Sequence, residues 1–148
     1  MLIKQLSVFI ENKEGRLEGV TQVLKEHNIN IASFSLADTA EYGMLRMIVS
    51  DPDEGRRVLK EQGFSVKLTD VIAVKIPQRS GTLHEILRVL NDAGLGVEYM
   101  YTLATAGRDT SIIMKTSDLT KALEVLKKRG YTLCTASEAY EINNISNK

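Results

Sequence analysis

Two short polar loops, each ending in a glycine and followed by an amphipathic stretch, carry the residues that could bind a charged ligand. The first loop ends at Gly15 and the second at Gly81. A glycine lets the backbone pass close to a ligand, and the first N–H groups of a helix have no partner within that helix. We therefore expect the N–H groups of Gly15, Arg16 and Leu17 to offer a site for a carboxylate. The alternative is that both glycines serve only as turn residues.

The sequence lacks the patterns of catalytic and metal sites. It has no P-loop, no H-E-x-x-H motif, no triad-like pairing and no carboxylate pair that can be placed in one pocket. His27 and His84 have no Cys, Asp or second His at metal-ligand spacing. Cys134 has no local basic companion, which is typical of an inert packing residue. We expect no catalytic residue, no metal and no cofactor.

Composition and charge exclude some classes of binding partner. The 148 residues are 43% hydrophobic and 26% charged, which is enough for a buried core. The 19 basic and 19 acidic residues balance, so no long-range field favours nucleic acid or an anionic membrane. The first residues read as a strand, with neither a signal peptide nor a membrane span. With a single cysteine, we expect a cytoplasmic protein.

The chain contains an internal repeat, which determines the elements that must position the loops. The segment that begins at Val8 aligns without a gap with the segment that begins at Val74, so that Gly15 coincides with Gly81. Matching residues later in the two copies are one position further apart than Gly15 and Gly81 are. One short insertion therefore separates the two matching blocks. The repeat covers nearly the whole chain, and we expect two copies of one structural unit.

In each copy, the periodicity of the apolar residues predicts the element order β-α-β-β-α-β. Leu6, Val8 and Ile10 alternate with Gln5, Ser7, Phe9 and Glu11, as in a strand with one face on a core. Asp51 before Pro52 predicts the start of a helix. Four helices are predicted. They cover residues 16–26, a stretch that starts at Asp51 and is closed by Gly63, residues 82–91 and residues 119–129. The other predicted strands cover residues 29–37, 44–49, 64–68, 71–76, 97–103, 110–115 and 132–138.

Right-handed crossovers turn this order into two tandem ferredoxin-like units of the α+β class, each an antiparallel sheet with both helices on one face. We expect the units at residues 1–69 and 70–142, followed by a flexible C-terminal tail at 143–148. The T-x-x-E spacing of Thr82 and Glu85 predicts a capping box. Uncovered sheet faces and open sheet edges predict association into a homodimer.

These patterns resemble the ACT domain family, whose members are ferredoxin-like regulatory modules that commonly bind amino acids. The family's pattern is a strand, a polar loop ending in glycine, Val or Leu two residues later, an amphipathic helix, and an Ile-Asn-Ile-like start of the second strand. The first copy matches over residues 10–17 and 29–31, and the second over 76–83 and 95–97. The proline usual before the glycine is Glu14 in the first copy.

The resemblance implies a non-catalytic regulatory module that binds a free amino acid at the glycine loop and at domain interfaces. It implies ligand contacts from Asn12 and Asn30, and a side-chain amide offers both the donor and the acceptor that a zwitterion needs. Alternatively, Asn12 holds its own loop and Asn30 caps the strand. The candidate ligand-binding residues are Asn12, Lys13, Glu14, Gly15, Arg16, Leu17, Asn30 and Ile31.

The second copy offers a weaker candidate site, formed by Gln78, Gly81, Thr82 and Leu83. Gln78 replaces Asn12 with a longer amide that loses more rotamer entropy when it is ordered. Gly96 stands where the first copy has Asn30, so one amide is missing. We therefore expect the first copy to carry the main polar contacts.

Two other functions fit the fold class. RNA-recognition domains share the topology but display aromatics beside basic residues, whereas aromatics here total 5% and the charge is balanced. A protein-docking or dimerisation module without a ligand remains the alternative to amino-acid binding. In either case we expect a regulated protein partner in trans, because the chain shows no catalytic domain.

Overall fold

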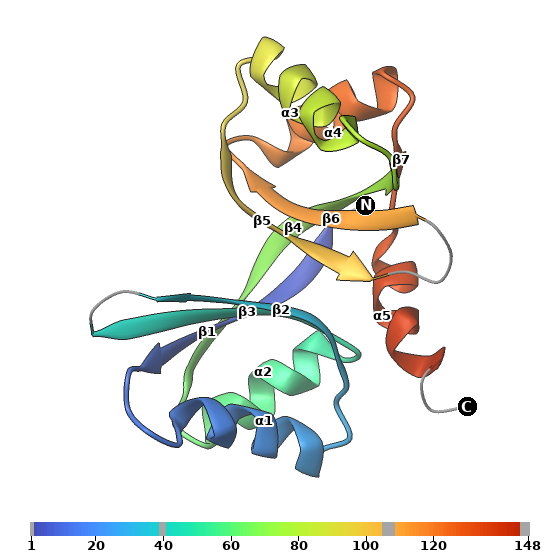
Figure 1. The fold of residues 1–148 in the computed structure, drawn as a ribbon. Helices are drawn as coiled ribbons and strands as arrows, with labels where there is room; N and C mark the ends of the chain where they lie inside the picture. Colours follow the sequence, from blue (N-terminus) through green and yellow to red (C-terminus); the bar gives the residue numbers. More distant parts are fainter. Residues whose placement is uncertain (1, 39–40, 105–108, 146–148) are drawn as a thin grey trace. The chain divides into compact units, whose positions relative to one another are not determined.

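The computed structural model describes residues 2–38, 41–104 and 109–145, which form two compact units (Figure 1). The N-terminal unit comprises residues 4–69 and the helical residues from Ala139 on. The C-terminal unit comprises residues 70–138 together with Leu2 and Ile3.

The N-terminal unit is a sheet with two helices. Its elements are β1 (Ile3–Glu11), α1 (Arg16–Glu26), β2 (Ile31–Asp38), β3 (Tyr42–Val49), α2 (Pro52–Glu61) and the first part of β4 (Ser65–Pro77). The strands lie in the order β2-β3-β1-β4. β3 pairs antiparallel with both neighbours, so that Leu45 lies opposite Val8 of β1 and Leu36 of β2. The predicted order and class are confirmed.

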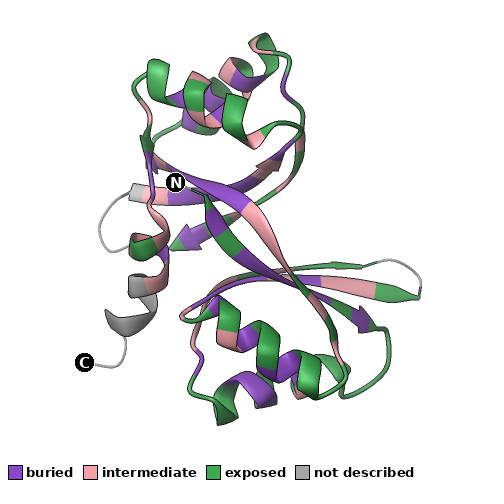
Figure 2. Cartoon of the chain, turned by 180° about the vertical axis from the view of Figure 1, so that it is seen from behind, coloured by how far each residue is buried: buried purple, intermediate pink, exposed green. Residues whose placement is uncertain are grey.

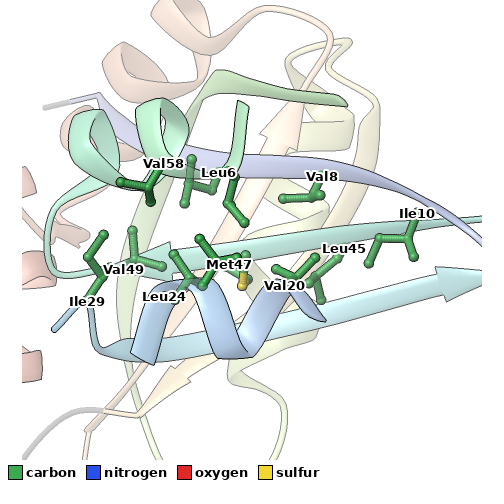
Figure 3. Close-up of a cluster of buried hydrophobic side chains, with 12 residues drawn as sticks. Leu6, Val8, Ile10, Val20, Leu24, Ile29, Leu45, Met47, Val49 and Val58 are labelled. Carbon is green, nitrogen blue, oxygen red and sulfur yellow. The ribbon is translucent and has the colours of Figure 1, made fainter. Parts of the chain in front are cut away.

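Both helices of this unit pack on the same face of the sheet, as the strand alternation predicts. The apolar residues of β1 and β3 that share this face are buried against α1 and α2 (Figure 3). Asp51 caps α2 as predicted, because its Oδ1 accepts the Glu54 N–H at 3.2 Å and Pro52 is the first helical residue. The core consists of Leu6, Val8, Ile10, Val20, Val23, Leu24, Ile29, Leu45, Met47, Val49, Val58 and Leu59.

The C-terminal unit repeats the arrangement with a shorter last strand. Its further elements are α3 (Thr82–Asp92), β5 (Val97–Ala104), β6 (Asp109–Thr116), α4 (Leu119–Lys128) and β7 (Thr132–Leu133). β4 pairs with β6 and β7, and β5 pairs with β6, each antiparallel. Its core consists mainly of buried residues of β4, β6, α3 and α4, and Figure 2 shows exposed residues along the helices and on β5.

Three predictions differ from the structure by more than the one or two residues that separate the other predicted and observed element ends. The strands predicted at 64–68 and 71–76 are one continuous strand, β4, so no turn separates the two copies. The strand predicted over 132–138 is wrong, since β7 ends at Leu133 and helix α5 (Ala136–Ile145) follows. α5 includes Asn143, where the predicted tail begins, and residues 146–148 lie outside the described residues.

A capping box that the sequence reading overlooked explains the start of α5. Thr135 Oγ1 accepts the Glu138 N–H at 3.1 Å, and Glu138 Oε1 accepts the Thr135 N–H at 3.4 Å. Glu138 Oε2 also accepts a hydrogen bond from Lys75 Nζ of β4 at 2.5 Å. These bonds fix a helix start at a position where the repeat pattern predicts strand.

The capping box predicted for Thr82 and Glu85 is wrong. The residue that caps α3 is Gly81, which makes no side-chain hydrogen bond to the helix. The Thr82 hydroxyl lies 3.2 Å from the Pro77 carbonyl and 3.1 Å from the Arg79 carbonyl, to which it donates. The threonine stands one position too late to accept a hydrogen bond as a cap.

Candidate ligand-binding site

The turn at the end of the first loop requires a glycine. Gly15 adopts φ 80° and ψ −8°, the left-handed conformation that costs other residues energy, and directly precedes α1. Gly81 has nearly the same backbone, with φ 89° and ψ −6°, before α3. The two repeats therefore share one loop-to-helix geometry, and side chains must account for any difference in binding.

The loop leaves fewer N–H groups available than the sequence predicts. The Arg16 N–H donates to the Lys13 carbonyl at 3.3 Å, so it is engaged within the turn. Among the described residues, the N–H groups of Gly15 and Leu17 make no hydrogen bond. The Arg16 guanidinium lies 5.0 Å from the centre of the Phe64 ring, a cation–π contact that directs this side chain to the helix-covered core.

A pocket of about 210 Å³ opens beside this loop, where the first turn of α1 meets the ends of β1, β2 and β3. Its lining combines an amide, a cation, two carboxylates and two exposed apolar side chains, so a carboxylate pair that the sequence did not place in one pocket lies here. The lining residues are Ile10, Glu11, Asn12, Lys13, Leu17, Leu36, Asp38 and Gly43.

Charges of both signs reach this pocket. Lys13 and Asp38 both line it, so a cation and a carboxylate lie at one site. Lys13 Nζ also lies 3.3 Å from Glu11 Oε2, but both side chains are at least half exposed, so this pair is weak and screened by salt. Lys13 can therefore exchange that partner for a ligand carboxylate at little cost.

Gly43 gives the pocket its depth. It lies opposite Ile10 of β1 and Asp38 of β2 in the strand register. A Cβ atom at this position would lie 3.3 Å from Cδ1 of Leu36, closer than ordinary contact. A side chain at Gly43 would therefore push against Leu36 and reduce the space of the pocket that both residues line.

The structure does not bring the predicted site residues together in one hollow, and Asn12 and Lys13 also line a second hollow, of about 390 Å³, with Glu41 and Tyr42. Asn12, Lys13 and Leu17 line the loop pocket, whereas Glu14, Gly15 and Arg16 form the turn beside it. Asn30 and Ile31 line a different hollow of about 370 Å³ beyond the last turn of α1, together with Thr21, Leu24, Lys25, Asn28 and Ile29. Since α1 has 11 residues, roughly 16 Å separates its two ends.

Asn30 also has a structural role at the start of β2. Its N–H donates to Ser50 Oγ at 3.0 Å, and its carbonyl accepts the Ser50 N–H at 3.0 Å. This exchange ties the start of β2 to the end of β3. Within one N-terminal unit, Asn30 and Asn12 therefore do not line the same pocket.

Sequence reasoning missed Leu36, Asp38 and Gly43. The sequence predicts a polar hairpin turn over residues 38–43, of which 39–40 lie outside the described residues. The signal that could have found the pocket residues is the antiparallel order, because β3 starts and β2 ends beside the end of β1. Asp38 and Gly43 therefore lie at the same end of the sheet as the glycine loop.

The equivalent region of the C-terminal unit is built differently. Ile76 lies opposite Thr110 as Ile10 lies opposite Gly43, so Thr110 supplies a side chain where the first copy has none. Gln78 Nε2 donates a hydrogen bond to Thr110 Oγ1, which engages the amide. Ala104 lies opposite Thr110 at the position of Asp38, so the carboxylate is absent.

The remaining candidates of the second site take part in the turn and the helix start. Thr82 is buried, with its hydroxyl donated to backbone carbonyls, and Leu83 is partly exposed. Burial, and then the negative charge of Glu138, raises the pKa of the Cys134 thiol. Among residues 2–38, 41–104 and 109–145, no group of three or more His, Cys, Asp or Glu side chains could hold a metal ion.

The comparisons with known proteins agree with this architecture. The ACT domain pair family matches residues 1–142, and the chain belongs to this family. A crystal structure of a protein from Bacteroides thetaiotaomicron is similar at 41% identity and a TM-score of 0.90, over 95% of this chain and 97% of that one.

More distant structures share the fold alone. The regulatory subunit of aspartate kinase from Thermus thermophilus is 18% identical with a TM-score of 0.61, over 84% of this chain and 90% of that one. The same subunit from Thermus flavus is 18% identical with a TM-score of 0.58, over 86% and 93%. No curated protein matches the sequence. In the described part of the chain, every helix is too short or too polar to cross a membrane.

Proposed function

We propose that this ACT domain pair is a non-catalytic regulatory module that binds a free amino acid in the loop pocket of its N-terminal unit. The observation that carries this proposal is the joint presence of Lys13, Asn12 and Asp38 around one small pocket. A zwitterion needs a donor for its carboxylate and an acceptor for its ammonium, and these three side chains supply both. The available N–H groups of Gly15 and Leu17 lie in the adjoining turn.

The C-terminal unit is the weaker or empty site in this proposal. Its Gln78 amide is held by Thr110, and Ala104 offers no acceptor for an ammonium group. The shared glycine turn alone then offers only backbone donors, which bind a carboxylate without selecting an amino acid. We therefore assign the principal site to the N-terminal unit.

We propose further that the protein acts as a homodimer and regulates a protein partner in trans, in the reducing cytoplasm that a single cysteine permits. β2 stands at one end of the path of described strands, and Phe34 on it is 68% exposed. Open edges with exposed apolar side chains favour association. Asn12 and Asn30 line different hollows, so both can touch one ligand only if a second copy supplies its Asn30.

The same exposed edge favours a second candidate function, a docking module without a small ligand. A thermal-shift panel of free amino acids at millimolar concentration separates the two. A ligand at 100 times its Kd adds about 2.7 kcal/mol, which corresponds to a rise of roughly 5–10 °C. If no amino acid changes the melting temperature, the docking function replaces the binding function.

Matched variants locate the site. Asn12→Ala should weaken binding of the stabilising amino acid by about 1 kcal/mol, or about fivefold in Kd, because an exposed amide contributes at the low end of hydrogen-bond energies. Gln78→Ala is the control and should leave the Kd unchanged. Calorimetry in which Gln78→Ala abolishes binding and Asn12→Ala does not would contradict the assignment.

A further inference from the structure

We propose that the loop pocket selects an amino acid with a small aliphatic side chain, and that Leu17, Leu36 and Gly43 determine this selectivity. The inference rests on the proposed function, because it names the side chain of the ligand at the same site. The residues that carry it are apolar and differ from the polar residues that bind the ammonium and carboxylate groups in the proposed function.

The apolar part of the pocket is exposed and lies beside its polar part. Leu17 is 42% exposed and Leu36 is 49% exposed, although both line the pocket. Ile10, which is part of the core, closes the pocket on the sheet side. A ligand that covers the two leucines removes apolar surface from water, and an aliphatic side chain does so without burying a polar group.

The strand register sets the distance between the charged and apolar parts. Asp38 follows Leu36 by two residues on β2, so both side chains lie on the same face of the sheet. Two residues of strand span roughly 6.6 Å. This spacing lets one amino acid place its ammonium at Asp38 while its side chain contacts Leu36.

Size and charge favour a small aliphatic ligand over other classes. The pocket volume of about 210 Å³ is below the roughly 300–1,000 Å³ of pockets for drug-sized molecules, which fits a ligand of amino-acid size. An acidic side chain would add a negative charge beside Glu11 and Asp38. A basic side chain would lose hydration against Leu17 and Leu36.

The C-terminal unit lacks the same apolar wall. Thr102 lies opposite Ile112 as Leu36 lies opposite Leu45, so a polar residue replaces the leucine. Thr110 fills the position that Gly43 leaves open. Leu36→Thr and Gly43→Ala therefore reproduce features of the other unit. Leu36 is exposed, and the methyl group added at Gly43 requires only a small shift of the exposed Leu36 side chain.

Calorimetry of the full chain with leucine, valine, alanine, aspartate and lysine tests the inference. We expect leucine to bind more tightly than valine and valine more tightly than alanine, by roughly fourfold for each buried CH₂ group. Aspartate and lysine should bind at least roughly tenfold more weakly than leucine, because their charges lose hydration at an apolar wall.

The variants provide a readout that a merely structural effect would not give. Leu36→Thr should weaken leucine by at least roughly fourfold and leave alanine nearly unchanged. Gly43→Ala should weaken leucine more than alanine, since its methyl group occupies the depth of the pocket. The melting temperature of each variant without ligand serves as the folding control.

The possible failures are distinct. If aspartate or lysine binds more tightly than leucine, the aliphatic selectivity is wrong although the amino-acid function stands. If Leu36→Thr weakens alanine and leucine equally, Leu36 does not contact the ligand side chain and the inference is wrong. If none of the common amino acids binds, both the inference and the proposed function fail.

Discussion

Replacement of Gly55 by alanine tests how closely α2 packs on β1. A Cβ atom built on Gly55 would lie 2.7 Å from Cδ1 of Leu6 and 3.7 Å from Cδ2 of Leu24. Leu6 is fully buried, so its methyl group cannot move aside without disturbing the core. Alanine in a helix gains about 1 kcal/mol over glycine, whereas an added methyl group in a packed core costs about 1–3 kcal/mol. The variant should therefore lose about 0–2 kcal/mol of unfolding free energy.

Gly19 of α1 provides the matched control. A Cβ atom there would lie 3.5 Å from Cζ of Phe64, which is ordinary contact. Gly19→Ala should keep the full gain of about 1 kcal/mol, so the two variants should differ by about 1–3 kcal/mol. Urea unfolding followed by circular dichroism measures the difference. If Gly55→Ala stabilises the protein as much as Gly19→Ala does, α2 does not lie as close to β1 as described.

Four further predictions concern α5, the thiol and assembly. The hydrogen bond from Lys75 lowers the pKa of Glu138, so the contribution of this pair is complete above the ordinary glutamate pKa of about 4.3 and is lost as the pH falls below it. Urea unfolding at pH 7 and pH 3 should show a smaller acid-induced loss for Glu138→Gln than for wild type, by less than about 1 kcal/mol because both side chains are partly exposed. Thr135→Ala should cost about 1 kcal/mol at pH 7, and no loss would contradict the capping box. Cys134 should react with iodoacetamide at neutral pH far more slowly in the native protein than in urea, since burial raises the pKa of its thiol; equal rates would show that the thiol is accessible. Light scattering at micromolar concentration should give a mass well above the 16.5 kDa of one chain, and a mass near that value would exclude the dimer.

Periodicity and repetition predict the elements of this fold well. The alternation of apolar residues around Val8 and their helical spacing after Gly15 are local signals. Both place apolar side chains in one core on a single face of the sheet. Two copies of the same signals then specify two sheets with helices on one face. These features need only the pattern of apolar residues along the chain.

The T-x-x-E spacing predicts a capping box correctly at one helix and wrongly at another, and the difference is a shift of one residue relative to the helix start. Thr82 and Glu85 have the spacing of a capping box but start one residue inside α3, after a glycine with positive φ. Thr135 and Glu138 have the same spacing and form the box. Sequence spacing alone does not distinguish these cases, because the backbone conformation before the threonine decides between them.

The candidate pocket shows the limit of local reading more clearly. The glycine loop with Asn12 and Lys13 is contiguous, so its pattern is visible in the sequence. Asp38 and Gly43 reach the same pocket only through the pairing of β1, β2 and β3. The resemblance implies ligand contacts from both Asn12 and Asn30, but the length of α1 separates Asn30 from the loop pocket within one unit.

The stoichiometry of amino-acid binding tests the central claim most directly. Titration of the full chain, in a calorimeter, with the amino acid that raises the melting temperature most should give one ligand per chain. This result follows because Asp38 and Gly43 are present only in the N-terminal copy, while Ala104 and Thr110 replace them in the other. Two ligands of equal affinity per chain, or a single site that Asn12→Ala leaves intact and Gln78→Ala removes, would contradict the account.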